Sequence, residues 1–272
     1  MGDFPSSGRQ ADNIPVPGFL SKKPIATEER LIFALDVPSN EQAQAFVDAL
    51  GESVHFYKLG LELFMAGGYV DMLRSLVDQN KKVMVDLKFF DVPETVRSAV
   101  RQLTRFQATL HPRRANQATS LCLTFATVHG NEDILKAACE EKAGLKILAV
   151  TVLTSLDRKD LDDLGFLCDV KTLVLSRARR ALAVGCDGVI SSGLEASALR
   201  ESLGEQFLIV TPGIRPVANT DDQKRTVDVE EAFRNGADYI VVGRPIREAP
   251  DPRTAAEEIQ SRIGTLFARG TE

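Results

Sequence analysis

Short apolar runs alternate with amphipathic segments along nearly the whole chain. The runs are almost continuously hydrophobic, as expected of parallel strands that are covered on both faces. Eight such runs occur, at residues 31–37, 54–61, 82–89, 123–129, 146–153, 188–192, 207–214 and 239–246. This number and spacing predict a sheet of eight parallel strands.

The segments between the runs have the 3.6-residue patterning of helices. Residues 39–51 begin with Ser39 or Asn40 as an N-cap and end at Gly51, and residues 170–185 and 226–236 also end in glycine. Eight strands that are each followed by a helix predict an α/β protein with a single (β/α)8 TIM barrel. A doubly wound open sheet is the alternative, but no Gly-x-Gly-x-x-Gly motif follows the first run.

Three segments depart from this regular alternation. Residues 1–28 are rich in Pro, Ser and Gly, so we expect a flexible N-terminal extension before a barrel domain at residues 29–270. An insertion at about 106–121 precedes the fourth run, and we expect a loop there on the bottom face of the barrel. The connection at 154–169 follows the fifth run, so it belongs to the top face and could line a site.

Composition excludes several classes of protein. The 272 residues are 44% hydrophobic and 26% charged, with a net charge of −5 and no basic stripe, which argues against nucleic acid as a partner. The four cysteines and three histidines are scattered, so we expect no metal site. No signal peptide and no apolar run of membrane-spanning length are visible, which predicts no membrane association and a cytoplasmic location.

Charged residues stand inside or just beyond three of the apolar runs. Asp86, Lys88 and Asp91 follow one another in "DLKFFDVPETV", Asp36 lies in "ALDVPS", and Lys58 lies in "FYKLG". Because the carboxyl ends of barrel strands meet at one face, we expect all five side chains to converge on the mouth. A salt-bridge layer that caps the barrel is the structural alternative.

Such an array of alternating charges is suited to chemistry on an anion. Lysines placed between carboxylates keep one another ionised in a partly dry pocket. A carboxylate at the reaction centre can destabilise a substrate anion, and an adjacent ammonium group can protonate a developing carbanion. Five charges at the ends of three successive strands favour a catalytic site over a structural layer.

The last two strands carry a second signal. "TPGIR" (211–215) and "VVGRPI" (241–246) each place a glycine and an arginine just beyond a strand, where TIM barrels commonly bind phosphate. Gly213 and Gly243 would let backbone N–H groups approach the phosphate, and Arg244 offers a fork of donors. Residues 216–226 are a candidate lid with Gln223 as a gripping amide, although an ordinary solvated loop fits them nearly as well.

These motifs together resemble the orotidine 5′-phosphate decarboxylase family. "DLKFFDVPETV" is similar to the family signature Asp-x-Lys-x-x-Asp-Ile/Val-Pro-x-Thr at every fixed position. "LDVPS", "FYKLG", "VTVLTS", "TPGIRP", "DDQKR" and "VVGRPI" resemble family segments in the expected order. The resemblance extends from about Leu31 to Ile259.

The resemblance implies a cofactor-independent carboxy-lyase that converts orotidine 5′-phosphate to uridine 5′-phosphate in pyrimidine biosynthesis. Lys58, Asp86, Lys88 and Asp91 would form its catalytic array, with Asp86 against the substrate carboxylate and Lys88 as the proton donor to C6. Asp91 and Thr95 would enter the neighbouring subunit's site, which makes a homodimer the expected partner arrangement.

The resemblance also implies the groups that hold the substrate. Asp36 and Lys58 would bind ribose hydroxyls and Thr154 the pyrimidine edge, and the phosphate would be held by Arg215, Gln223, Gly243 and Arg244. Two residues depart from common family choices, Phe90 in place of His and Glu94 in place of Asn. We expect them to alter packing or dimer contacts without loss of the chemistry.

Two alternatives stay open. Sister enzymes on the same scaffold, the hexulose-phosphate synthases and keto-gulonate-phosphate decarboxylases, use Asp-x-Lys-x-x-Asp to bind Mg²⁺ around an enediolate. Lys58 would repel a divalent cation and argues against that reaction. A barrel that binds a nucleotide without turnover would be expected to lack a member of the charged array, and none is missing.

Overall fold

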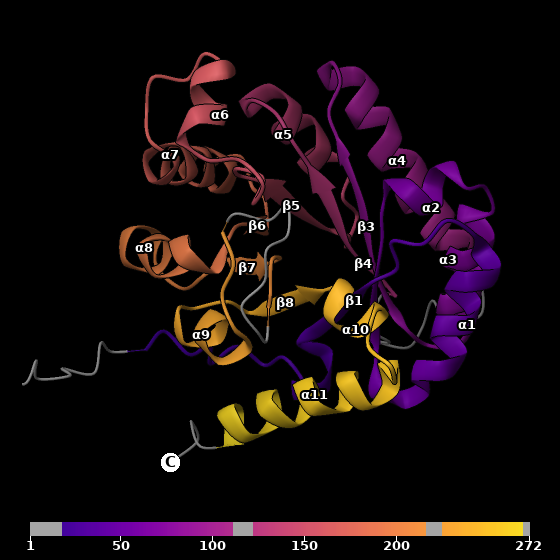
Figure 1. Cartoon of the computed structure of the whole chain (residues 1–272). Coiled ribbons are helices and arrows are strands. Elements are labelled where there is room, and N and C mark those ends of the chain that lie inside the picture. The colour runs from indigo at the N-terminus through magenta and orange to yellow at the C-terminus, as the bar shows by residue number, and fades with distance from the viewer. Residues whose placement is uncertain (1–17, 111–121, 216–224, 269–272) are drawn as a thin grey trace, which may run out of the picture.

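The computed structural model describes residues 18–110, 122–215 and 225–268, which form a closed parallel barrel surrounded by helices (Figure 1). Each strand pairs with the next in chain order, and β1 also pairs with β8, which closes the barrel. The strands are β1 (Leu31–Ala34), β2 (Phe56–Leu59), β3 (Lys82–Phe89), β4 (Leu123–Val128), β5 (Lys146–Val150), β6 (Gly188–Ile190), β7 (Leu208–Thr211) and β8 (Tyr239–Val242). The predicted (β/α)8 TIM barrel is confirmed.

All eight apolar runs contain a strand, but most strands end before the run does. The strand β1 ends at Ala34, for example, although its run continues to Val37. Most of the remaining residues lie beyond the carboxyl ends of the strands, at the top face, where a TIM barrel carries its site.

The helices follow the strands in the expected alternation. They are α1 (Asn40–Leu50), α2 (Leu61–Met65), α3 (Tyr69–Asp78), α4 (Pro93–Leu110), α5 (Glu132–Glu140), α6 (Arg158–Asp163), α7 (Val170–Ala183), α8 (Gly193–Leu203), α9 (Val229–Arg234), α10 (Arg244–Arg247) and α11 (Pro252–Ala268), with 3-10 turns η1 (Thr27–Glu29) and η2 (Gly51–Ser53). The predicted caps are present on α1, where the Ser39 side chain accepts a hydrogen bond from the Gln42 N–H and Gly51 follows the helix with a φ of 50°. None of the described helices combines the length and the apolar character that a bilayer-spanning helix needs.

Alternate residues of the strands build two separate cores. One set points into the barrel, where Phe56, Phe125 and Tyr239 pack with ring centroids 5.1–5.9 Å apart. The other set, including Leu31 and Phe33, packs outward against the helices. The lower half of the barrel is therefore filled by side chains, and space for a ligand is confined to the upper end.

Residues 18–28, assigned from the sequence to the flexible extension, are packed against the bottom of the barrel. The buried Asp238, just before β8, accepts hydrogen bonds from Ser21 Oγ at 2.5 Å and Lys23 Nζ at 3.0 Å, and also from Arg200 and the Ile209 N–H. The indigo segment before β1 in Figure 1 passes beside α9 and α11. Polar contacts to one buried carboxylate fix this segment, which is why its composition did not reveal the packing.

The other corrections concern the insertion and the cysteines. Residues 106–110 continue α4 as helix, so the predicted loop begins later, and residues 111–121 lie outside the described part of the chain. Two of the cysteines are not isolated, because Cys139 Sγ lies 3.6 Å from Cys186 Sγ as a pair of free thiols.

Candidate active site

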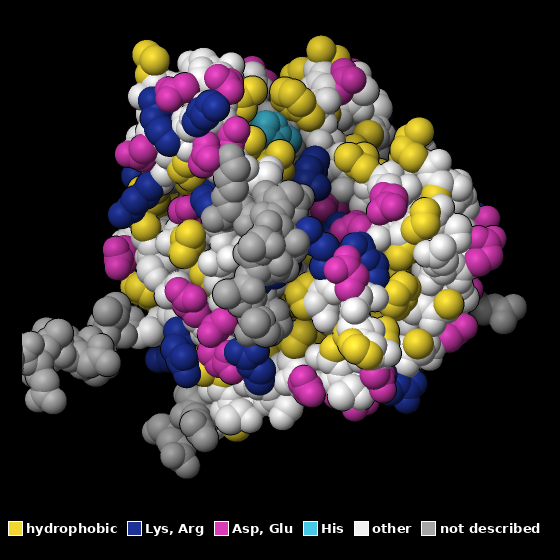
Figure 2. All heavy atoms as spheres, viewed as in Figure 1, with side chains coloured by type: hydrophobic (Ala, Val, Ile, Leu, Met, Phe, Trp, Pro, Cys, Tyr) yellow, Lys and Arg dark blue, Asp and Glu magenta, His cyan; other side chains and the backbone are white. Residues whose placement is uncertain are grey.

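A cavity of about 490 Å³ opens at the carboxyl ends of the strands, a volume within the usual range for a small-molecule site. In Figure 2, Lys and Arg side chains (dark blue) meet Asp and Glu side chains (magenta) at a hollow near the middle of the face shown. The charged residues among the described lining are Asp36, Lys58, Glu62, Asp86, Lys88, Arg215, Arg244 and Arg247. Five of these are cations and three are carboxylates, so the cavity favours an anion although the chain as a whole is acidic.

Four of the predicted charges form one continuous chain of ion pairs. Lys58 Nζ on β2 lies 2.9 Å from Asp36 Oδ1 and 3.3 Å from Asp86 Oδ2. Lys88 Nζ lies 3.0 Å from the same Asp86 Oδ2. Asp86 therefore lies between two ammonium groups, and it is only 7% exposed.

Burial and pairing act in opposite directions on these groups. Burial alone would raise the pKa of Asp86, but the ammonium groups of Lys58 and Lys88 outweigh burial and lower this pKa below its ordinary value. Burial would likewise lower the pKa of Lys58, but the Asp86 and Asp36 carboxylates outweigh it and raise this pKa. Both partners are therefore charged at neutral pH although both side chains are buried.

The strand β3 reaches this arrangement through a bulge. Val85 pairs with Ala126 and Phe89 pairs with Val128, so three residues of β3 stand opposite the single residue Thr127 of β4. Within the bulge, the backbone of Lys88 has a φ of 47°. This value lies in the left-handed region, which residues other than glycine rarely adopt. The bulge lets Asp86 and Lys88 both line the cavity while the strand still pairs on either side of it.

Asp91 and Thr95 are not part of this cluster within one chain. Asp91 is exposed and its Oδ1 accepts a hydrogen bond from the Val92 N–H at 2.7 Å, whereas neither residue lines the cavity. The expectation that all five charges converge within one chain is therefore wrong for Asp91, because Asp91 lies beyond the end of β3 and its side chain is exposed outside the cavity. Phe90, beside it, is 66% exposed.

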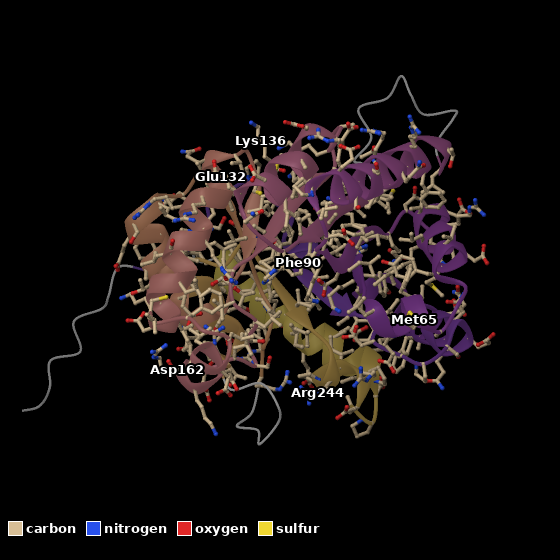
Figure 3. All side chains as sticks on the ribbon, turned by 90° about the horizontal axis from the view of Figure 1, so that it is seen from above. Met65, Phe90, Glu132, Lys136, Asp162 and Arg244 are labelled. Carbon is tan, nitrogen blue, oxygen red and sulfur yellow. The ribbon has the colours of Figure 1, made fainter. Side chains whose placement is uncertain are left out.

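The predicted phosphate residues that the structure describes line the cavity from the loops after β7 and β8. Gly213 and Arg215 follow β7, and Gly243 and Arg244 follow β8, and all four border the cavity. Gly243 directly precedes α10, so the first N–H groups of this short helix also lie at this end (Figure 3 labels Arg244). Glycines, arginines and a helix N-terminus together are a favourable environment for a phosphate dianion.

Two further predicted substrate-binding residues are Thr154 and Gln223, of which the structure describes only Thr154. Thr154, in the loop after β5, lines the cavity. Gln223 and the candidate lid at 216–224 lie outside the described residues.

Arg225, at the far end of that segment, is buried. It pairs with Glu195 Oε1 at 2.7 Å and donates to the carbonyl oxygens of Val152 and Leu153. It therefore ties the end of the β7 loop to the β5 loop that carries Thr154.

Sequence reasoning missed three residues at or next to the site. Ser191 lines the cavity after β6. Arg247 also lines it and donates to the Asp36 carbonyl oxygen at 2.5 Å. Thr127 lies behind Asp86 in β4. The repeated arginine in "GRPIR" was a usable signal for Arg247, whereas nothing in the apolar run at 123–129 distinguishes Thr127 from Thr124.

The described residues contain no group of three or more His, Cys, Asp or Glu side chains arranged to hold a metal ion. Asp86, the most buried carboxylate of the cavity, already has two ammonium groups within 3.3 Å. A divalent cation at this carboxylate would have to displace or neutralise both.

Comparison of the sequence with known families gives one extensive match. The profile of the "Orotidine 5'-phosphate decarboxylase / HUMPS family" matches residues 29–259. An orotidine 5'-phosphate decarboxylase of Methylococcus capsulatus is 57% identical over 257 residues, which cover 94% of this chain and all of that protein. The enzyme of that name from Xanthomonas axonopodis pv. citri is 49% identical over 88% of this chain and 94% of its own length.

Solved structures agree with the sequence comparison. The crystal structure of orotidine 5'-phosphate decarboxylase from Lactobacillus acidophilus superposes with a TM-score of 0.72 at 35% identity, and it covers 86% of this chain and 99% of its own. The structure of that name from Pyrococcus horikoshii gives a TM-score of 0.65 at 26% identity with the same coverage. The match from residue 29 to residue 259, together with relatives that are 57% and 49% identical over at least 94% of their own length, shows that the chain belongs to the orotidine 5'-phosphate decarboxylase / HUMPS family.

Proposed function

We propose that this chain decarboxylates orotidine 5′-phosphate to uridine 5′-phosphate and CO2, the last step of de novo uridine monophosphate synthesis, without a cofactor. The single observation that carries the proposal is the position of Asp86 Oδ2, which lies 3.3 Å from Lys58 Nζ and 3.0 Å from Lys88 Nζ inside a cationic cavity. The names of the relatives that are 57% and 49% identical support the same reaction.

The substrate lies across the cavity with its phosphate toward β7 and β8. Arg215, Gly243 and Arg244 hold the phosphate, with Gln223 as a further donor. At the other end, Asp36 and Lys58 bind the ribose hydroxyls, and Thr154 binds the edge of the pyrimidine. This orientation places the reacting carbon beside the chain of ion pairs.

Decarboxylation breaks the bond between C6 and the carboxylate carbon. The bonding electron pair stays on C6 as CO2 leaves, and the Lys88 ammonium group transfers a proton to C6. Lys88 then regains its proton from solvent. Asp86 faces the substrate carboxylate before the bond breaks, so their repulsion is relieved as CO2 departs, and the lysines stabilise the negative charge that develops on C6.

The phosphate contributes although it does not react. Its contacts with the arginines are distant from C6, and the binding energy that they supply can offset the cost of placing the substrate carboxylate against Asp86.

A homodimer with shared sites is part of the proposal. Asp91 and Thr95 are exposed outside the cavity of their own chain, where they could reach a second subunit. Apolar side chains are exposed next to Asp91, with Phe90 66% and Val92 63% accessible, and Met65 at the end of α2 is 78% accessible (Figure 3 labels Met65 and Phe90). Exposed apolar side chains on neighbouring loops are typical of an interface. A cytoplasmic location is also part of the proposal.

The metal-dependent sister reaction is the second candidate, because the family description covers both kinds of enzyme. Lys58 argues against it, since its ammonium group occupies the position beside Asp86 that a divalent cation would need.

Ultraviolet absorbance of orotidine 5′-phosphate, followed with purified protein in EDTA, tests the proposal. Loss of substrate with formation of uridine 5′-phosphate would support it and exclude a divalent metal requirement. A folded protein that consumes no orotidine 5′-phosphate, with or without added Mg²⁺, would overturn it.

A further inference from the structure

The bulge in β3 depends on one hydroxyl group of the neighbouring strand. Thr127 in β4 stands alone opposite residues 86–88, and its side chain is fully buried. Its Oγ1 accepts a hydrogen bond from the Lys88 backbone N–H at 2.9 Å and donates one to Asp86 Oδ1 at 2.9 Å. Both functional residues of the bulge are thus bound to the same oxygen atom.

Each of these two hydrogen bonds has a distinct effect. The bulge removes the regular strand pairing at Lys88, whose left-handed backbone is itself unfavourable, and the hydroxyl replaces the missing acceptor for the Lys88 N–H. The second bond fixes Oδ1 of Asp86, while Oδ2 remains turned toward the two ammonium groups. A hydroxyl has one donor and two acceptor positions, so it can serve both partners at once.

We infer that Thr127 is a positioning residue of this active site, which sets the separation and orientation of Asp86 and Lys88 through its hydroxyl group. It does not line the cavity, so it does not touch the substrate. The inference rests on the proposed decarboxylase function, because it assigns Thr127 to the reaction of those two residues.

Two substitutions of Thr127 separate the effect of its hydroxyl group from the effect of its shape. Thr127→Val keeps the branched shape and removes the hydroxyl, whereas Thr127→Ser keeps the hydroxyl and removes a methyl group. Thr211 provides a matched control, because it is equally buried and its hydroxyl has no hydrogen-bond partner among the described residues. Thr211→Val therefore makes the same chemical change without breaking a bond.

The experiment measures kcat and KM for orotidine 5′-phosphate across pH, together with uridine 5′-phosphate binding and thermal unfolding. In Thr127→Val we expect kcat to fall by roughly 10- to 100-fold, since small displacements of reacting groups cost about this much. We expect KM and product binding to change by less than about threefold, because the phosphate contacts are remote. The acidic limb of the kcat profile should move to higher pH, since Asp86 loses a donor.

The two other variants decide between a role in positioning and a role in packing. Thr127→Ser and Thr211→Val should both keep a kcat close to that of the unmodified protein. The inference is overturned if Thr127→Val retains the kcat and pH profile of the unmodified protein, or if Thr127→Ser is as impaired as Thr127→Val. If Thr127→Val does not fold, the kcat of Thr127→Ala, which lacks the hydroxyl, is compared with that of Thr127→Ser, which keeps it.

Failure of the proposed function can be distinguished from failure of the inference about Thr127. If the unmodified protein fails to turn over orotidine 5′-phosphate, the decarboxylase proposal is wrong. A crystal structure of Thr127→Val would then test the positioning on its own, with Lys88 expected to leave its positive φ or to lie farther than 3.0 Å from Asp86. An unchanged bulge in that variant would overturn the inference.

Discussion

Lys58 Nζ on β2 lies 3.3 Å from Asp86 Oδ2 on β3, so two neighbouring strands contribute opposite charges to one buried point. An unpaired carboxylate that is this deeply buried would bind a proton to escape the cost of desolvation. The lysine keeps Asp86 ionised, which is the state that the proposed reaction needs.

Removal of the Lys58 charge should therefore shift the pH dependence of the reaction. In Lys58→Met, burial acts on Asp86 with only Lys88 and the Thr127 hydrogen bond opposing it, so the pKa of Asp86 rises and the acidic limb of the kcat profile moves to higher pH. We expect kcat near neutral pH to fall by about 100-fold or more, the usual cost of losing one electrostatic partner. Steady-state rates across pH check this.

Lys136→Met is the matched control, because Lys136 is exposed on α5 far from the charged cluster (Figure 3). It should leave the pH profile unchanged. An unshifted acidic limb in Lys58→Met would show that Asp86 does not depend on this ion pair for its charge.

If Arg244 binds the substrate phosphate, its substitution should lower activity only toward a substrate that carries the phosphate. Arg244→Ala should lower kcat/KM for orotidine 5′-phosphate by about 100- to 10,000-fold, because a charge-assisted pair in the transition state is lost. With orotidine, which lacks the phosphate, the same substitution should have almost no effect. Arg179→Ala, at an exposed position on α7, serves as the control. Equal losses with both substrates would place Arg244 elsewhere in the mechanism.

Shared sites predict recovery of activity in mixed dimers. Lys88→Ala and Asp91→Ala should each be inactive, and Lys88→Ala should still bind uridine 5′-phosphate. After subunit exchange at equal amounts, half of the dimers are hybrids with one intact site, so activity should recover to about a quarter of the unmodified value. The rate after mixing measures this recovery.

A second mixture provides the control for this experiment. Asp86 and Lys88 belong to the same site of the same chain, so Asp86→Ala mixed with Lys88→Ala leaves every site defective and should recover nothing. Native mass spectrometry establishes that exchange has occurred. No recovery in the first mixture despite proven exchange would mean that Asp91 does not act across a subunit boundary.

Substitution of two glycines by alanine should change the free energy of unfolding in opposite directions. A Cβ on Gly188 of β6 would lie 2.3 Å from the Leu208 carbonyl oxygen of β7, so Gly188→Ala should cost about 2 kcal/mol or more. Gly264 lies within α11 and has nothing within 4 Å of its added Cβ, so Gly264→Ala should stabilise by about 0.5–1 kcal/mol. Urea unfolding measures both, and a Gly188→Ala variant as stable as Gly264→Ala would contradict the close approach of β6 and β7.

The sequence predicted the barrel because each strand lies in an apolar run and the segments between the runs have the 3.6-residue period of helices. It also predicted that Asp36, Lys58, Asp86 and Lys88 would meet, since the carboxyl ends of parallel strands share one face. Both predictions use rules that hold for every barrel of this kind.

The features that the sequence did not predict depend on single contacts between distant parts of the chain. The left-handed backbone of Lys88 follows from a change of register between β3 and β4, which a pattern of two-residue alternation cannot show. Thr127 is one hydroxyl in an apolar run, and its importance depends on which residues lie opposite. The packing of residues 18–28 depends on Asp238, more than 200 residues away.

The closure of β1 on β8 and the contact of Ser21 with Asp238 have a consequence for synthesis on the ribosome. Ser21 and Asp238 are separated by 217 positions. Ser21 therefore cannot form this hydrogen bond until the residues directly before β8, the last strand of the barrel, have been synthesised. Until β8 has left the exit tunnel, one edge of β1 has no neighbour in its own chain. The nascent protein therefore carries an open sheet edge until β8 has been made, and Ser21 has no Asp238 to bind for just as long.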